Sequence, residues 1–114
     1  MPDCVFCKIV SGELPSRIVH QGELVTAFRD LNPQAPVHVL IVPNQHIGGV
    51  NDLTAEHTPI LAALFAAAKK IASDEGLAQN GYRLVLNQGS HGGQTVVHLH
   101  LHLLGGRRMI WPPG

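Results

Sequence analysis

The run His98-Leu99-His100-Leu101-His102 constrains this chain more than any other feature. Successive side chains of a β-strand point to opposite faces of the sheet, so strict alternation predicts a strand, expected over Val96 to Leu104. Its apolar face, with Val97 and Leu103, would lie in the core and fix the register. The three imidazoles would then stand in a row on the other face, about 6.6 Å apart.

Three interpretations of this row compete. The first is a polar, half-exposed strand face, which would suit a single histidine better than three at strict alternation. The second is a metal site, since two histidines at i and i+2 can chelate one ion and three can hold a catalytic zinc. The third is nucleophilic catalysis, in which a neutral imidazole attacks phosphorus and forms a covalent intermediate.

The segment before the row, Asn87 to Thr95, favours the third interpretation. It is rich in glycine, amides and hydroxyls and contains no carboxylate. Backbone N–H groups next to glycines can form an anion-binding nest, and Asn87 and Thr95 can add side-chain donors. It is not a Walker-type loop, because no Gly-Lys-Ser/Thr follows. Taken alone it could be a flexible hairpin connection, but beside the histidine row it suggests a phosphate cradle.

The rest of the chain predicts an α+β domain with a mainly antiparallel sheet. The periodicity and the Gly and Pro positions predict a short helix over Cys4 to Val10, strands over Leu24–Asp30, Val37–Val42 and Tyr82–Leu86, and a turn over Leu31–Pro36. One long helix follows the N-cap candidate Thr54 and ends near Gly76. Its predicted apolar stripe is Ile60, Leu61, Leu64, Phe65, Ala68, Ile71 and Ala72.

Composition bounds the function. With 114 residues and 45% hydrophobic residues, the chain suits a single domain, 1–114, with a real core. Eight Lys and Arg balance eight Asp and Glu, so no basic stripe points to nucleic acid. The N-terminus lacks the pattern of a signal peptide and no segment is long enough to span a membrane, which predicts a cytoplasmic protein. In that compartment the close spacing of Cys4 and Cys7 favours a metal or free thiols over a disulfide.

Together these segments resemble the histidine triad (HIT) superfamily, most closely its Hint branch of purine nucleoside phosphoramidases. The resemblance covers nearly the whole chain in the expected order. It is carried by Phe28–His38, Gly81–Asn87, Gly92–His102, the Gly105-Gly106-Arg107 segment and the ending Trp111-Pro112-Pro113-Gly114. It implies a HIT fold, which is an antiparallel sheet of about five strands with one long and one short helix. It also implies that the sheets join across a homodimer, with the C-terminal tail reaching the partner's site.

The resemblance also implies a role for each matching residue. His100 would be the nucleophile, attacking the α-phosphorus of a nucleoside 5′-phosphoramidate, and His102 would contact the phosphate oxygens. His38 would orient and polarise the site, and Asp30 would bind the ribose hydroxyls. The implied phosphate and leaving-group contacts are Asn87, Gly93, Gln94 and Thr95, and the implied base-pocket residues are Phe28, Leu31, Val5, Phe6, Ile9, Leu14 and Val96. The apolar residues among these could equally be ordinary core.

The resemblance further suggests a structural zinc ion, because some members hold one between two cysteines and two histidines. The matching positions here are Cys4, Cys7, His46 and His98, and the alternative is a pair of free thiols with His98 buried. Two features depart from relatives: Thr95 stands where many have serine, and Arg29 where the branch often has histidine. Thr95 keeps the hydroxyl, and Arg29 suggests no consequence.

The sequence therefore predicts hydrolysis of the P–N bond of purine nucleotides, with no organic cofactor, nucleic-acid or membrane partner. Three rivals stay open. One is a dinucleoside polyphosphate hydrolase of the same superfamily, the second is a non-enzymatic nucleotide-binding or scaffold protein, and the third is a zinc hydrolase that uses all three histidines.

Overall fold

A computed structural model describes residues 3–114, so residues 1 and 2 of the expected domain lie outside it. These residues form a five-stranded antiparallel sheet in the order β1-β2-β3-β5-β4. The elements are α1 (Val5–Ser11), β1 (Ile18–Gln21), β2 (Val25–Arg29), β3 (Val37–Pro43), the 3-10 turns η1 (Val50–Asp52) and η2 (Ala55–His57), α2 (Thr58–Asp74), β4 (Arg83–Leu86), α3 (Gly89–Gly92) and β5 (Leu101–Gly105). The expected α+β class and antiparallel sheet are confirmed, while β1 and the four-residue α3 were not predicted.

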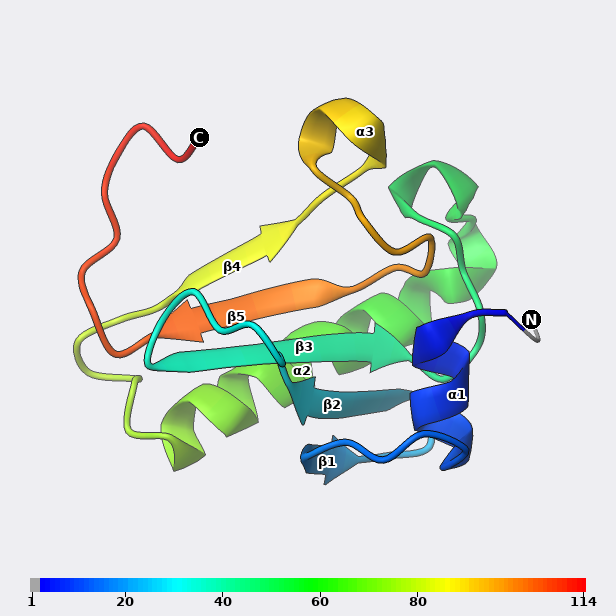
Figure 1. The fold of residues 1–114 in the computed structure, drawn as a ribbon, viewed down its shortest axis with the longest axis horizontal. Coiled ribbons are helices and arrows are strands. Elements are labelled where there is room, and N and C mark those ends of the chain that lie inside the picture. The colour runs from blue at the N-terminus through cyan, green and yellow to red at the C-terminus, as the bar shows by residue number, and fades with distance from the viewer. Residues whose placement is uncertain (1–2) are drawn as a thin grey trace.

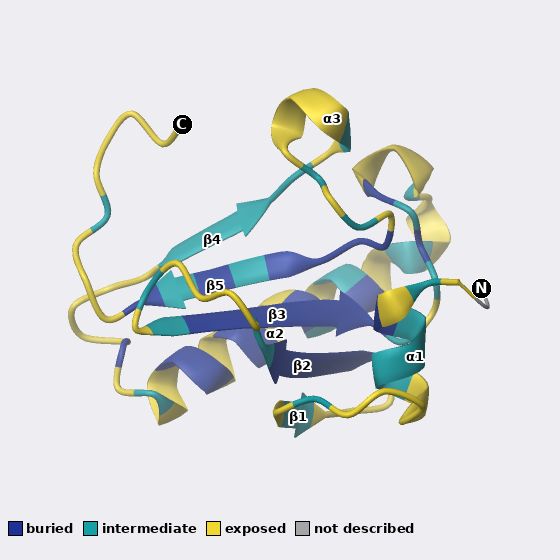
Figure 2. Ribbon diagram, viewed as in Figure 1, coloured by how far each residue is buried: buried dark blue, intermediate teal, exposed yellow. Residues whose placement is uncertain are grey.

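Helices α1 and α2 lie on opposite faces of the sheet (Figure 1). The long helix α2 covers one face, and the short helix α1 lies on the other, near the start of β2 and the end of β3. The central strands β2 and β3 and the start of β5 are the most buried part of the sheet (Figure 2). No helix among the described residues is long and apolar enough to cross a membrane.

The register of β3 and β5 separates the histidines from the leucines. Leu40 pairs with His102, and Val39 pairs with Leu103, so one face carries His102 and the other carries the leucines. Leu99, Leu101 and Leu103 belong to the main core with α2, which confirms the predicted leucine face. A second, smaller core of Phe6, Phe28, Leu40 and Val42 lies on the histidine side.

Two details of the predicted histidine strand are wrong. β5 begins only at Leu101, because residues 96–98 form a bend and residues 99 and 100 have no regular structure. Val97, expected in the core, is therefore 71% exposed. His98 and His100 are buried, because α1 lies over this end of the histidine face.

The boundaries of the helices follow from their caps. Gly12 takes a left-handed conformation, with a φ of 86°, at the C-terminus of α1, where the sequence predicted the helix end. Thr54 caps the short turn η2, and α2 itself begins at Thr58 with Pro59 in its first turn.

Five of the seven predicted stripe residues of α2 are buried, but Phe65 is 52% exposed. Its expected place in the core is therefore wrong, since the ring faces outward from the helix.

Candidate functional site

His100 is held in one tautomer by the backbone beside it. Its Nδ1–H donates to the carbonyl of His98 at 2.7 Å, so the ring proton lies on Nδ1. The other nitrogen, Nε2, then keeps its lone pair. The ring is 5% exposed and packs edge-on against Phe6, with the ring centroids 5.1 Å apart. A histidine nucleophile needs a proton on one ring nitrogen and a lone pair on the other, and this hydrogen bond selects Nδ1 for the proton.

A chain of hydrogen bonds fixes the other two imidazoles of the site. The backbone N–H of Gln34 donates to Nδ1 of His38 at 3.0 Å. A neutral His38 must therefore carry its proton on Nε2, which lies 2.9 Å from Nδ1 of His102. Nδ1 of His102 accepts this bond, and the proton of His102 lies on its Nε2. The chain thus leaves His102 with an N–H donor on Nε2.

The pKa of His102 is lowered to about 4, first by burial and then by the neighbouring His100 and His38. Its ordinary value is 6.5, so between these values the unfolded chain binds more protons than the folded one. The resulting stability is fully present above pH 6.5 and is lost as the pH falls through 4. We expect the free energy of unfolding to decrease over this range, and His102→Gln to weaken the dependence. Urea denaturation between pH 7 and 4.5 checks this; equal slopes in both proteins would contradict it.

Asp30 lies at the end of β2 beside this chain. Its Oδ1 accepts a hydrogen bond from the backbone N–H of Asn32 at 2.8 Å, and its Oδ2 lies 3.5 Å from Nε2 of His38. Donor atoms of Asp30, His38 and His102 all lie within 4.8 Å of one another, as metal ligands can. The Gln34 N–H argues against a metal there, because it keeps the His38 proton on the nitrogen that would have to bind the ion.

A second group of side chains lies at the N-terminus of α1, which places Cys4 and Cys7 against His46 and His98. Sγ of Cys4 lies 3.3 Å from Nδ1 of His98, and Sγ of Cys7 lies 3.3 Å from Nδ1 of His46 and 3.5 Å from Nδ1 of His98. All four donor atoms lie within 4.8 Å of one another. We call these four residues the N-terminal clip.

The clip fits a tetrahedral metal ion. Bond lengths of about 2.0 Å to nitrogen and 2.3 Å to sulfur require donor atoms about 3.3–3.8 Å apart, which is close to the distances found. Nε2–H of His98 donates to the carbonyl of Pro43 at 2.9 Å, which leaves Nδ1 free to bind the ion. Burial and the adjacent Cys4 raise the pKa of the Cys7 thiol, so a cation would be needed to hold it as a thiolate at neutral pH.

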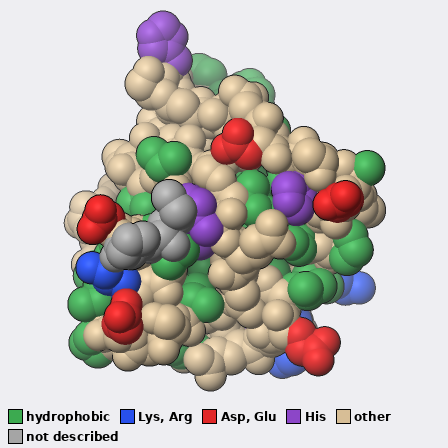
Figure 3. All heavy atoms as spheres, turned by 90° about the vertical axis from the view of Figure 1, so that its right-hand side faces the viewer, with side chains coloured by type: hydrophobic (Ala, Val, Ile, Leu, Met, Phe, Trp, Pro, Cys, Tyr) green, Lys and Arg blue, Asp and Glu red, His purple; other side chains and the backbone are tan. Residues whose placement is uncertain are grey.

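The three histidines of the row therefore do not converge on one ion. The free nitrogen of His98 faces the two cysteines, whereas His100 donates to the His98 carbonyl and His102 belongs to the chain from His38. This geometry argues against a zinc hydrolase that uses all three. On the face of the molecule that Figure 3 shows, histidine side chains reach the surface in separate places.

The segment from Asn87 to Thr95 contains the short helix α3, which was not expected. Gly93 ends it with a φ of 84°, a conformation that favours glycine. The side chain of Gln94 is fully used inside the protein: its Oε1 accepts from the N–H of Gly89, and its Nε2–H groups donate to the carbonyls of Gly48 and Val96. The backbone N–H of Gln94 also donates to the Gly89 carbonyl, at 3.0 Å. Gln94 therefore shapes this loop, and its donors are already bonded inside the protein.

The predicted base-pocket residues differ in their surroundings. Phe6 and Phe28 are buried and pack against each other, with ring centroids 5.4 Å apart. Both therefore belong to the smaller core. Leu31 is 93% exposed. Val5, Thr95 and Val96 do come together, in a cavity of about 320 Å³ lined by Asp3, Cys4, Val5, Thr95, Val96 and Val97. Ile9 packs on the Phe6 cluster, and Leu14 is exposed.

Arg29, for which the sequence suggested no role, forms a two-pronged ion pair. Its Nη1 and Nη2 donate to the two carboxylate oxygens of Glu75 at 3.0 and 3.1 Å. The pair joins the end of β2, next to Asp30, to the C-terminus of α2. The sequence also did not predict three backbone groups of the site, namely the Gln34 N–H and the carbonyls of Pro43 and His98. Every residue has such groups, so a pattern of side chains does not point to them.

Comparisons with known proteins identify the family to which the chain belongs. The HIT domain matches residues 11–109. The purine nucleoside phosphoramidase of Escherichia coli (strain K12) is 55% identical over 105 residues, covering 92% of this chain and 88% of that protein. A 14 kDa zinc-binding protein of Zea mays is 50% identical over 112 residues, covering 96% and 87%.

The solved structures agree as well. A HIT family hydrolase from Legionella pneumophila Philadelphia 1 superposes with a TM-score of 0.96 at 53% identity, covering 98% of this chain and all of that one. The fold, the histidine cluster and the family match therefore lead to one conclusion: the chain belongs to the HIT domain family.

Proposed function

We propose that this protein hydrolyses the P–N bond of purine nucleoside 5′-phosphoramidates, such as adenosine 5′-phosphoramidate and AMP–lysine adducts. The activity named for the Escherichia coli relative supports this substrate class. The observation that carries the proposal is the locked tautomer of His100, whose Nδ1–H is held at 2.7 Å by the His98 carbonyl. That bond leaves Nε2 free to attack, and it can strengthen as the ring becomes positively charged.

In the first step, Nε2 of His100 attacks the α-phosphorus and an N–P bond forms. The P–N bond to the amine breaks, and its electron pair leaves with the amine, which takes up a proton. The Thr95 hydroxyl is the proposed donor toward the leaving group. Nε2–H of His102 donates to a phosphate oxygen, and the Asn87 side chain adds a further donor to the developing negative charge. The N–H of Gly93 instead donates to the Ser90 carbonyl, so the contribution of Gly93 is the shape of the loop.

In the second step, water attacks phosphorus on the nucleotidyl-histidine and gives a proton to the Thr95 oxygen, which replaces the proton that the amine took up. The N–P bond breaks, its electron pair returns to Nε2 of His100, and the nucleoside monophosphate leaves. His38 acts through His102, because its Nε2–H bond keeps Nδ1 of His102 an acceptor and Nε2 a donor in both steps. His38 thus orients the donor without touching phosphorus.

Asp30 is the proposed ribose contact, since a carboxylate can accept hydrogen bonds from two vicinal hydroxyls. We expect Asp30→Asn to lower kcat/KM about 10- to 100-fold, because hydrogen bonds to a charged group contribute about 1.5–3 kcal/mol. Steady-state kinetics with ribose and 2′-deoxyribose substrates check the contact. If Asp30→Asn and removal of the 2′-hydroxyl lose activity additively, the carboxylate does not bind that hydroxyl.

Zinc is the proposed occupant of the N-terminal clip. The four donors suit this ion, and the Zea mays relative is named a zinc-binding protein. When bound, the ion supplies charge to hold both thiolates and joins α1 to the histidine segment, and it takes no part in catalysis. Both cysteines are free in the structure, which suits the reducing cytoplasm, the proposed location.

A homodimer is the proposed assembly. Within residues 3–114, β4 pairs with β5 alone, so its outer edge is open to a second strand. The tail beyond β5 carries Ile110 and Trp111, which are 75% and 80% exposed, as suits a segment that reaches a partner's site. Light scattering should give the mass of two chains of 12.2 kDa each, and the mass of one chain would contradict the dimer.

One kinetic comparison tests the activity against its rivals. Adenosine 5′-phosphoramidate and a diadenosine polyphosphate are offered separately to the purified protein. We expect turnover of the phosphoramidate with kcat/KM at least about 100-fold higher than for the dinucleotide. The reverse preference would favour a dinucleoside polyphosphate hydrolase. Nucleotide binding without turnover of either substrate would favour a binding or scaffold protein.

A further inference from the structure

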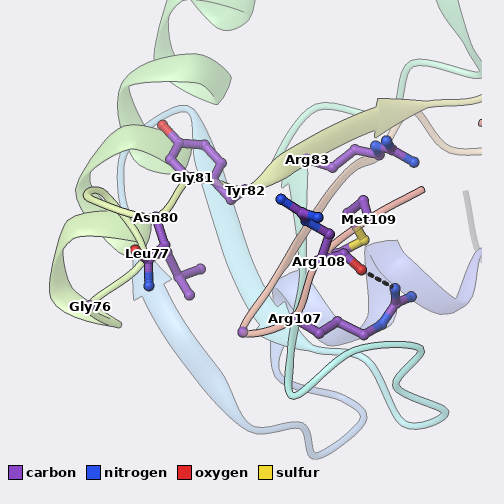
Figure 4. A pocket seen from close by; sticks show the side chains of 10 residues that line it. Gly76, Leu77, Asn80, Gly81, Tyr82, Arg83, Arg107, Arg108 and Met109 are labelled. Atoms are coloured by element: carbon purple, nitrogen blue, oxygen red, sulfur yellow. Dashed lines mark hydrogen bonds between the residues drawn. The ribbon is translucent and has the colours of Figure 1, made fainter. Parts of the chain in front are cut away.

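Arg107 is the second residue after β5, where the C-terminal tail begins. Its Nε–H and Nη2–H both donate to the carbonyl of Gln34, at 3.2 and 2.9 Å. A third donor, on Nη1, reaches the carbonyl of Arg108 at 3.1 Å. In Figure 4 the Arg107 side chain extends away from Leu77 and Asn80, on the far wall of a cleft of about 670 Å³, and the dashed line marks the bond to Arg108.

The Gln34 residue that Arg107 holds is also the residue that fixes His38. The Gln34 carbonyl accepts the two guanidinium bonds, and the Gln34 N–H donates to Nδ1 of His38. The two groups lie in the successive peptide planes that meet at the Gln34 Cα, so holding the carbonyl limits how far the backbone can turn the N–H away from His38. A continuous series of hydrogen bonds therefore runs from Arg107 through Gln34 and His38 to His102.

The turn over residues 31–36 needs an external restraint. Pro33 and Pro36 have no N–H to donate, and five of its six residues are exposed. Besides the guanidinium bonds, the turn is held by the Asn32 N–H to Asp30, by the Gln34 side chain to the Asn32 carbonyl and by the Gln34 N–H to His38 itself. Among the hydrogen bonds of the described chain, only those from Arg107 hold the Gln34 carbonyl.

The backbone beside Arg107 is also shaped to approach this turn. Gly106 has a φ of 90°, and a Cβ added there would lie 2.8 Å from Cβ of Pro36. A side chain at this position would push the tail away from the turn. This close packing is independent of the guanidinium bonds and brings the same two segments together.

We propose that Arg107 is a positioning residue for the histidine cluster. By holding the Gln34 carbonyl, it directs the Gln34 N–H at His38. This bond keeps the His38 proton on Nε2, and the His102 proton then lies on the Nε2 of His102. The expected effect of Arg107 on turnover rests on the proposed function, whereas its expected effect on the His38 tautomer does not. Arg107 touches neither phosphorus nor nucleotide in this account.

The test compares Arg107→Ala and Arg107→Lys with the matched control Arg108→Ala. Arg108 is the adjacent exposed arginine, and its side chain makes no hydrogen bond to the described residues. The first readout is the ¹⁵N spectrum of the histidine rings in the full, ligand-free protein, which reports which ring nitrogen carries the proton. The second is kcat and KM for adenosine 5′-phosphoramidate.

We expect Arg107→Ala to give His38 a mixture of tautomers and to lower kcat about tenfold, with KM changed less than about twofold. Arg107→Lys should recover part of both, and Arg108→Ala should match the wild type. A pure Nε2–H tautomer of His38 in Arg107→Ala would overturn the inference, whatever the rate. If the wild type turns over no phosphoramidate, the proposed function fails while the ring spectra still decide this point. Should Arg107→Ala not fold, the Lys variant decides it by the same spectra.

Discussion

Replacing His100 by alanine lowers kcat for adenosine 5′-phosphoramidate by at least about 10⁴-fold, as expected for loss of a covalent nucleophile. No other imidazole can take its place. His98 directs its free nitrogen at Cys4 and Cys7, and His102 uses its Nδ1 to accept from His38. The measurement is single-turnover kinetics with excess enzyme, which isolates the chemical step from product release.

The matched control is His20→Ala, which removes an imidazole from the edge strand β1 and should change kcat less than about twofold. Nucleotide affinity should survive in His100→Ala, because the proposed ribose and base contacts are untouched. Turnover of His100→Ala within about tenfold of the wild type would rule out the covalent route. It would favour direct attack by water at the same site.

Cys7→Ser, or removal of the metal with a chelator, lowers the melting temperature by more than about 10 °C. Helix α1 has seven residues, too few to be stable alone, and it is attached to the sheet by the clip and by the buried Phe6 ring. Losing a buried aromatic contact costs about 3–5 kcal/mol, and each kcal/mol corresponds to about 4–8 °C in a domain of this size. Calorimetry measures the shift, and metal analysis measures the zinc content.

Ser11→Ala is the control for this prediction, since Ser11 is exposed at the end of the same helix and lies outside the clip. It should change the melting temperature by no more than a few degrees, because exposed substitutions usually fall within about 0.5 kcal/mol. A protein purified with a full equivalent of zinc, yet equally stable after chelation, would show that the clip does not hold α1 in place.

The leucine face of the histidine segment was predictable because alternation fixes a register. Leu99, Leu101 and Leu103 are in the main core as expected. The exposure of the histidine face was not predictable, because it depends on where α1 docks. The ring of Phe6 packs against His98 and His100, and Phe6 belongs to α1, which is far from these histidines in the sequence. The same packing occupies residues 98–100, where the predicted strand would have begun.

The side chains that meet at the site were largely predictable, but the atoms that set their chemistry were not. Cys4, Cys7, His46 and His98 come together as the resemblance implied. The tautomers of His100 and His38, in contrast, are set by the His98 carbonyl and the Gln34 N–H, which every residue type offers. The sequence places Gln94 in the predicted phosphate loop, but only the structure shows that its side-chain amide bonds to three backbone groups.

The most direct test of the central claim is to isolate the covalent intermediate. Wild-type protein is mixed with excess adenosine 5′-phosphoramidate and quenched within milliseconds into alkaline denaturant, since the N–P bond of a phosphohistidine is labile in acid. Digestion and mass spectrometry then locate any added AMP group. We predict one AMP group on Nε2 of His100, absent from His100→Ala. Turnover with no adduct in the quenched protein, or an adduct on any other residue, would contradict the account.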